Sequence, residues 1–177
     1  LPLFIKLYDD IGNAYRPTLE PYTEEIARKF EAKGFEVVRN AFCRIKPEFE
    51  EAVKKFESEN VDAIVTLHLA YSPSLESIEA LTKTDLPIVV LDTTYTPEYS
   101  HEYHKGFITF NHGIHGVMDM CSMIKRYKKP YAIAAGHAEN SDVIDRACGF
   151  VKAAVAAKAL SQTRVARVGS SFKGMGD

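Results

Sequence analysis

Cysteine, long apolar stretches and excess positive charge are all scarce in this 177-residue chain. Its three cysteines, Cys43, Cys121 and Cys148, are widely spaced and form no CxxC pair. We therefore expect reduced thiols in a cytoplasmic protein rather than a disulfide framework or a zinc site. No run approaches the roughly 18 apolar residues of a membrane span. The net charge of −2 gives no basic surface for a phosphate backbone, so we expect neither a membrane nor a nucleic acid as partner.

Several common site motifs are missing as well. The chain contains no GxGxxG, no GxxxxGK(S/T) and no GxSxG, which argues against a Rossmann dinucleotide site, a P-loop and a hydrolase nucleophile elbow. Asp9 and Asp10 suggest a phosphoacceptor receiver domain. Such a domain needs an aspartate after the third strand and a lysine after the fifth, where this chain has His68 and His137.

Short apolar runs alternate with helical patterns along the whole chain. Runs of this kind predict strands buried on both faces of a parallel sheet, at residues 2–8, 35–41, 63–69, 87–91, 131–135 and 164–168. Apolar residues at helical spacing predict helices between them, around residues 19–30, 49–56, 75–81, 114–124 and 143–155. The alternation predicts an α/β fold, a three-layer doubly wound (flavodoxin/Rossmann-like) sandwich with a parallel sheet of five or six strands.

Local signals refine three of these helices. Pro47 suits the first turn of the second helix. Ser72 and Pro73 predict the N-cap and the first residue of the third helix. In the fourth helix, the predicted buried stripe consists of Ile114, Val117, Met118, Cys121 and Ile124.

Polar residues gather where the predicted strands end. Ligands of open parallel sheets bind at this carboxyl edge, which makes Asp9, Tyr15 and His68 candidate contacts. Asn111, His112 and His115 open the fourth helix, and Gly113 and Gly116 bracket His115 and allow a close approach. His112, His115 and Asp119 share one helix face, which could be solvated, could contact a substrate or could hold a metal.

Four segments of the chain resemble L-arabinose isomerases and the related L-fucose isomerase-like proteins. FNHGIHG at residues 110–116 is similar to their LNQTAHGG, and LHLAYSP at 67–73 is similar to their WLHTFSP. YAIAAGH at 131–137 resembles VVTGH, and RVARVG at 164–169 resembles the RFG strand. His112 replaces the family glutamine, which favours the fucose isomerase-like branch. The likeness covers most of residues 60–177.

The resemblance implies an aldose–ketose isomerase acting on an L-sugar such as L-fucose or L-arabinose. Residues 1–163 would be its N-terminal domain, and 164–177 would be the last strand and the connection to a following domain. The family's pocket histidine corresponds to His115, with Asn111 and His112 beside it. The implied partners are the sugar, the remaining domains of the enzyme and further copies in a trimer or hexamer.

The same resemblance places the catalytic machinery outside this chain. A divalent ion, usually Mn²⁺, and paired carboxylates would lie in later domains, so we expect no catalytic residue, no metal and no activity here. A stand-alone flavodoxin-like domain, for binding a small ligand or for oligomerisation, is the alternative.

Overall fold

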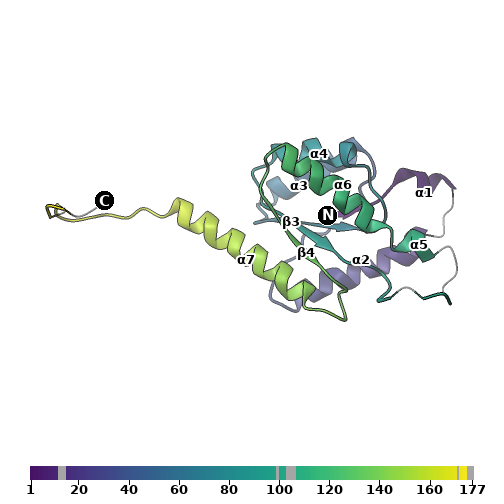
Figure 1. The fold of residues 1–177 in the computed structure, drawn as a ribbon. Helices are drawn as coiled ribbons and strands as arrows, with labels where there is room; N and C mark the ends of the chain where they lie inside the picture. Colours follow the sequence, from purple (N-terminus) through teal and green to yellow (C-terminus); the bar gives the residue numbers. More distant parts are fainter. Residues whose placement is uncertain (12–14, 99, 103–106, 171, 175–177) are drawn as a thin grey trace.

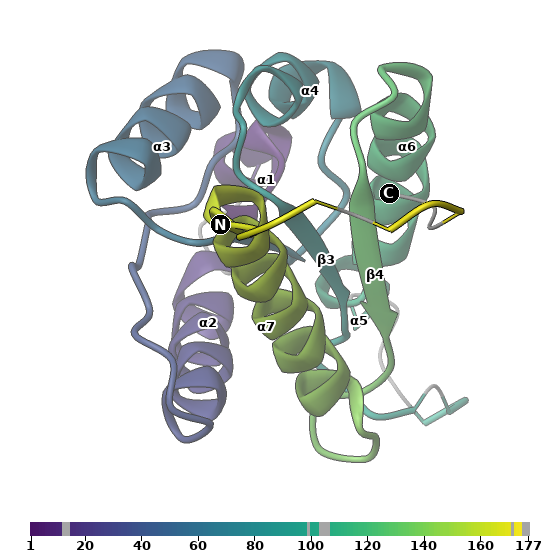
Figure 2. The ribbon, with the colours of Figure 1, turned by 90° about the vertical axis from the view of Figure 1, so that its left-hand side faces the viewer.

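The computed structural model describes residues 1–11, 15–98, 100–102, 107–170 and 172–174. Four parallel strands form one sheet in the order β1 (Pro2–Leu3), β2 (Ile64–His68), β3 (Ile88–Asp92) and β4 (Tyr131–Ala135). Helices α3 (Lys46–Ser58), α4 (Ser74–Lys83) and α6 (Gly113–Arg126) cover one face (Figure 2). Helices α2 (Tyr15–Glu31) and α7 (Val143–Gln162) cover the other face. This is the expected three-layer α/β sandwich, with four strands instead of five or six.

Two short helices lie at one end of the molecule, beyond the carboxyl ends of the strands. They are α1 (Lys6–Ile11) and α5 (Phe107–Phe110), and Figure 1 shows both on the side opposite the C-terminal tail. The prediction of a strand over residues 2–8 is therefore wrong beyond Leu3. The chain turns into α1 at Lys6, and none of the residues of α1 is buried.

Alternating side chains of the strands feed two separate cores. Leu67, Leu69 and Val89 join α2 and α7, whereas Ile64 and Ile88 join α3, α4 and α6. The predicted apolar stripes of α2 and α3 are buried, and Pro47 lies in the first turn of α3 as expected. A sheet buried on both faces explains why its strands carry nearly continuous apolar runs.

Two predicted strands are absent. Residues 35–41 have no regular structure, and the segment that follows them meets the sheet through a bridge from Cys43 to Leu3. Residues 164–168 are irregular and exposed, in a tail that runs away from the sandwich (Figure 1). Helix α7 lies on the face opposite α4 and α6, so a right-handed crossover from β4 would place the next parallel strand where β3 already lies.

Two details of the helices also differ from the sequence predictions. Helix α4 begins at Ser74 with Pro73 as its N-cap, so Ser72 is not the cap. In α6 the buried side is formed by Gly113, Gly116, Val117, Met120 and Ile124. Ile114 and Met118 are exposed, Met118 by 58%, because the two glycines bring a different side of the helix against β2.

Candidate functional site at the carboxyl edge

Two histidines meet at the start of α6. His112 is the N-cap of this helix and makes no side-chain capping bond. The ring centroids of His112 and His115 are 4.3 Å apart, and the ring of Tyr71 lies 6.1 Å from that of His112. His115 is exposed and His112 is half-buried. The arrangement presents two imidazoles at a helix N-terminus, and their ring nitrogens can bind polar groups of a ligand.

The electrostatic environment favours a neutral His112. Partial burial and then the neighbouring His115 lower the pKa of His112 below its ordinary value. A neutral imidazole carries one N–H donor and one nitrogen acceptor. Such a ring can both donate to and accept from the hydroxyl groups of a polyol.

His68 lies beneath this pair, at the end of β2. It is only 3% exposed, and burial lowers its pKa to about 3. A Cβ atom on Gly116 would lie 2.7 Å from Cδ2 of His68, and one on Gly113 would lie 2.5 Å from the His68 carbonyl oxygen. The two glycines therefore let α6 rest directly on His68, which remains neutral near pH 7 and is not accessible to a ligand.

Buried polar atoms accompany His68. Both ring nitrogens of His68, Oγ1 of Thr66 and Oγ of Ser72 have no hydrogen-bond partner among the residues that the structure describes. Buried polar groups are usually hydrogen-bonded, so four such atoms on one strand and its following turn are unusual. They mark the carboxyl end of β2 as a polar interior.

The carboxylate of Asp119 accepts hydrogen bonds from neighbouring residues of the site. Its Oδ2 accepts a hydrogen bond from the Ser74 backbone N–H at 3.0 Å and one from the Tyr71 hydroxyl at 3.5 Å. Asp119 thus caps α4, whose own N-cap is a proline without a side-chain acceptor. The shared helix face predicted from the i, i+3, i+7 spacing exists, but Asp119 is turned towards α4.

These contacts disagree with a metal site. Among the described residues, no group of three or more histidine, cysteine, aspartate or glutamate side chains could hold a metal ion. Since Asp119 is taken up by capping, His112 and His115 supply only two ligands. The residues that the structure describes do not form a cage for Mn²⁺.

Asn111 has a structural contact. It is 5% exposed, and its Oδ1 accepts a hydrogen bond from the backbone N–H of Thr96 at 3.0 Å. This bond ties the segment after β3 to the start of α6. Residues 99 and 103–106, between β3 and α6, lie outside the described residues.

Asp9 and Tyr15 lie on the α2 side of the same edge. Asp9 belongs to α1 and pairs with Arg16 at 2.8 Å and with Arg44 at 2.5 Å. The Tyr15 ring lies 5.1 Å from that of Tyr8 and 5.2 Å from that of Phe110. Within the described part of the chain, Asp9 makes no hydrogen bond, ion pair or ring contact with the histidine pair, whereas Tyr15 packs on Phe110, two residues before His112.

The sequence reasoning gave little weight to Tyr71, which contacts both His112 and Asp119. Its position three residues after His68 was the available signal, because that places it at the carboxyl edge directly after β2. Burial also raises the pKa of Asp92, at the end of β3. Neither residue stands in a recognisable catalytic motif.

The topology and this polar edge define a flavodoxin-like α/β domain with its candidate site beyond the carboxyl ends of the strands. Residues 18–162 match the family model of the L-arabinose isomerase N-terminal domain. The chain belongs to this family, which confirms the resemblance found in the sequence. A search of curated proteins gave no match. Among the described residues, no helix is long and apolar enough to span a membrane.

Proposed function

We propose that this chain is the domain of an aldose–ketose isomerase that contributes sugar contacts through His112 and His115. The observation that carries the proposal is the ring pair at 4.3 Å at the start of α6, in a member of the L-arabinose isomerase N-terminal domain family. L-Fucose and L-arabinose are the proposed sugar types. Asn111, His68, Asp9 and Tyr15 shape the surrounding edge.

The proposed contacts are hydrogen bonds to sugar hydroxyls. His112 is held neutral and can donate and accept, and His115 is exposed beside it. Isomerisation also requires a proton shuttle between neighbouring carbons, which general acid–base groups provide. The Tyr71–Asp119–Ser74 contacts take up the nearest carboxylate, so in this proposal the shuttle and any Mn²⁺ belong to other domains of the enzyme.

A first experiment assays the isolated chain. We expect no conversion of L-arabinose or L-fucose, with or without Mn²⁺, while sugar titration shifts the side-chain NMR signals of His112 and His115. Conversion by the isolated chain would contradict the assignment of catalysis to other domains. Histidine signals that do not shift at saturating sugar would contradict the proposed sugar contact, whatever the activity assay shows.

A second experiment uses the enzyme that carries this domain. His115→Ala should lower kcat/KM about 5- to 150-fold, which corresponds to about 1–3 kcal/mol for a hydrogen-bond partner left unpaired. The melting temperature should not change, since position 115 lies outside the buried side of α6. His137→Ala, at a histidine outside the ring pair, is the control and should leave kcat/KM unchanged. Unchanged catalysis with a lower melting temperature for His115→Ala would make His115 a structural residue.

A further inference from the structure

Within the described residues, β4 is an edge strand of the sheet with no strand on its outer side (Figure 2). Its five residues, YAIAA, include neither a charged residue nor a proline. At the other edge, β1 has only two residues, and the segment around Cys43 lies beside it. Edge strands that remain unpaired are usually short or carry a charge, a proline or a bulge, because free backbone groups attract another strand. The sequence of β4 lacks these protections.

Helix α7 takes the chain away from this edge. It contacts β3 and β4 on the face of the sheet that α2 also covers. Its far end leads into the tail that runs away from the sandwich (Figure 1). The helix that follows β4 therefore covers a face of the sheet and leaves the outer side of β4 free for a partner.

The backbone groups of β4 alternate between β3 and the outer side. The Gly136 N–H donates to the Asp92 oxygen of β3 at 3.0 Å, so the even-numbered residues of β4 face β3. The N–H and C=O groups of the residues between them point outward. These outward residues are Tyr131, Ile133 and Ala135. They are placed symmetrically about Ile133, the middle residue of the strand.

Apolar side chains border this outer side. Tyr131 belongs to the core beneath α6, so Ile133 lies on the same face of the sheet, where it is 42% exposed. Cys121 of α6 contacts the Tyr131 side chain. Ile114 and Met118 share a side of α6 with Cys121, and both are exposed. The free edge therefore lies beside apolar surface that a partner could bury.

The two ends of β4 carry opposite charges. At the amino end, Lys125, Arg126 and Lys128 are exposed and form no ion pair among the described residues. At the carboxyl end, Asp92 lies beside Ala135, and its carboxylate likewise has no ion-pair partner in the described part of the chain. A second copy of β4 in antiparallel orientation brings the basic end of each copy to the acidic end of the other. A parallel orientation would bring like charges together.

We propose that β4 pairs with β4 of a second copy of this chain, antiparallel and across a two-fold axis at Ile133. The two Ile133 residues exchange both backbone hydrogen bonds, and Tyr131 of each copy pairs with Ala135 of the other. The large ring of Tyr131 then lies beside the small Ala135 side chain. The Ala135 oxygen already accepts a bond from Arg146 at 2.6 Å, and its second lone pair accepts the Tyr131 N–H of the other copy.

The first test measures the oligomeric state by sedimentation velocity. A five-residue edge contact is small for a protein interface, so we expect a reversible dimer with a dissociation constant of about 10 µM. Ile133→Lys places two ammonium groups at the two-fold axis, and Ala135→Pro removes an outward N–H that β3 does not use. Each should raise the dissociation constant about tenfold or more. Leu75→Lys, at a 69% exposed leucine of α4, is the matched control and should leave it unchanged.

The second test measures residue-resolved hydrogen exchange of the chain without substitutions, at about 1 µM and at about 200 µM. The amides of Tyr131, Ile133 and Ala135 should exchange about tenfold more slowly at the higher concentration. The amides of Ala132 and Ala134, which face β3, should not change. Thermal melts at the lower concentration check that the variants fold, and the exchange pattern tests the proposal without them. Neither experiment depends on the proposed isomerase function.

Three results would overturn the proposal. The first is a chain that remains monomeric at about 200 µM, well above the expected dissociation constant. The second is a dimer in which the outward amides of β4 exchange at the monomer rate, because that dimer uses another surface. The third is slow exchange of these amides at every concentration, which would show that a segment of the same chain covers β4.

Discussion

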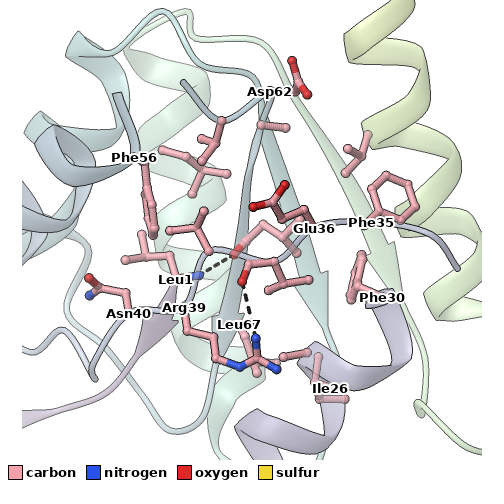
Figure 3. Close-up of a pocket in the computed structure, with 18 of the residues that line it drawn as sticks. Leu1, Ile26, Phe30, Phe35, Glu36, Arg39, Asn40, Phe56, Asp62 and Leu67 are labelled. Carbon is pink, nitrogen blue, oxygen red and sulfur yellow. Dashed lines mark hydrogen bonds between the residues drawn. The ribbon is translucent and has the colours of Figure 1, made fainter. Parts of the chain in front are cut away.

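The two ends of β2 contrast in how tightly they are covered. At the carboxyl end, His68 lies against two glycines of α6, where a Cβ atom would approach within 2.5–2.7 Å. At the amino end, Ile64 and Val65 border a cavity of about 440 Å³ (Figure 3). Both ends belong to one five-residue strand with nearly continuous burial. The comparison shows that strand sequence sets which residues are apolar, while the neighbouring elements set how closely they are packed.

This contrast bears on where function can lie. At the carboxyl end, the close packing of Gly113 and Gly116 on His68 fixes the distance between α6 and the sheet. This distance in turn fixes the positions of His112 and His115. The open end borders a cavity whose lining, among the described residues, contains no histidine. Substitutions that add or remove atoms should therefore have unequal effects at the two ends.

The largest effect is expected at the tight end. Gly113→Ala places a Cβ 2.5 Å from the His68 carbonyl oxygen, a backbone atom that cannot move away alone. We expect a loss of about 3 kcal/mol in the free energy of unfolding, measured by urea denaturation. Gly149→Ala in α7 is the control, because no atom lies within 4 Å of its added Cβ. The free energy of unfolding of this control should rise by up to about 1 kcal/mol through helix propensity. An equal loss in both variants would contradict the close packing of α6 on His68.

The next effect concerns the pH dependence of stability. The pKa of His68 is about 3 in the folded chain, against 6.5 for an exposed histidine, so the unfolded chain binds the additional proton as the pH falls. Stability should therefore decrease between pH 6.5 and 3, by about 2 kcal/mol from pH 7 to pH 5. His68→Gln lacks this titration, and its unfolding free energy should change less over that range. Parallel pH profiles for the two proteins would show that His68 is not held neutral.

A smaller effect is expected from the contact between α6 and α4. Asp119→Ala removes the acceptor for the Ser74 N–H and should cost about 1 kcal/mol of stability. Asp119→Asn keeps a carbonyl acceptor and should cost less. If Asp119→Asn destabilised as much as Asp119→Ala in chemical denaturation, the charge rather than the cap would matter.

The smallest effect is expected at the open end. Ala63→Val adds two methyl groups in the wall of this cavity and should change stability by no more than about 0.5 kcal/mol. Ala134→Val is the matched substitution in β4, at a position with 0% exposure, and should cost about 1–3 kcal/mol. Similar losses from both valines would mean that the wall of the cavity at Ala63 is packed as tightly as the sheet at Ala134.

Prediction from the sequence succeeded for elements whose own apolar periodicity shows which residues are buried. The apolar runs of β2, β3 and β4 and the stripes of α2 and α3 are found where the periodicity places them. It failed in α6, where Ile114 and Met118 looked like core residues. Apolar residues occur on both sides of that helix, and the close approach allowed by Gly113 and Gly116 selects the side that is buried.

The candidate site shows the same division. The spacing of His112 and His115 on one helix face is a local property and correctly predicts their proximity. The positions of Asp9 and Tyr15 could not be read from the chain, because they depend on ion pairs of Asp9 with Arg16 and Arg44 and on ring packing of Tyr15 against Phe110. Asp119 likewise turns to α4 only because Pro73 leaves that helix without a cap.

The sequence by itself determined the α/β class, the parallel sheet, the family and the helix that carries the histidine pair. Repeating apolar patterns and short motifs encode these features, because each depends on residues that are close together in the sequence. Only the tertiary structure decided the number of strands, the buried side of α6 and the engagement of Asp119. Residues 35–41 and 164–168 have strand-like sequences but form no strand here, because a strand requires a neighbour to pair with. Whether that neighbour is present depends on crossover handedness and on distant parts of the chain.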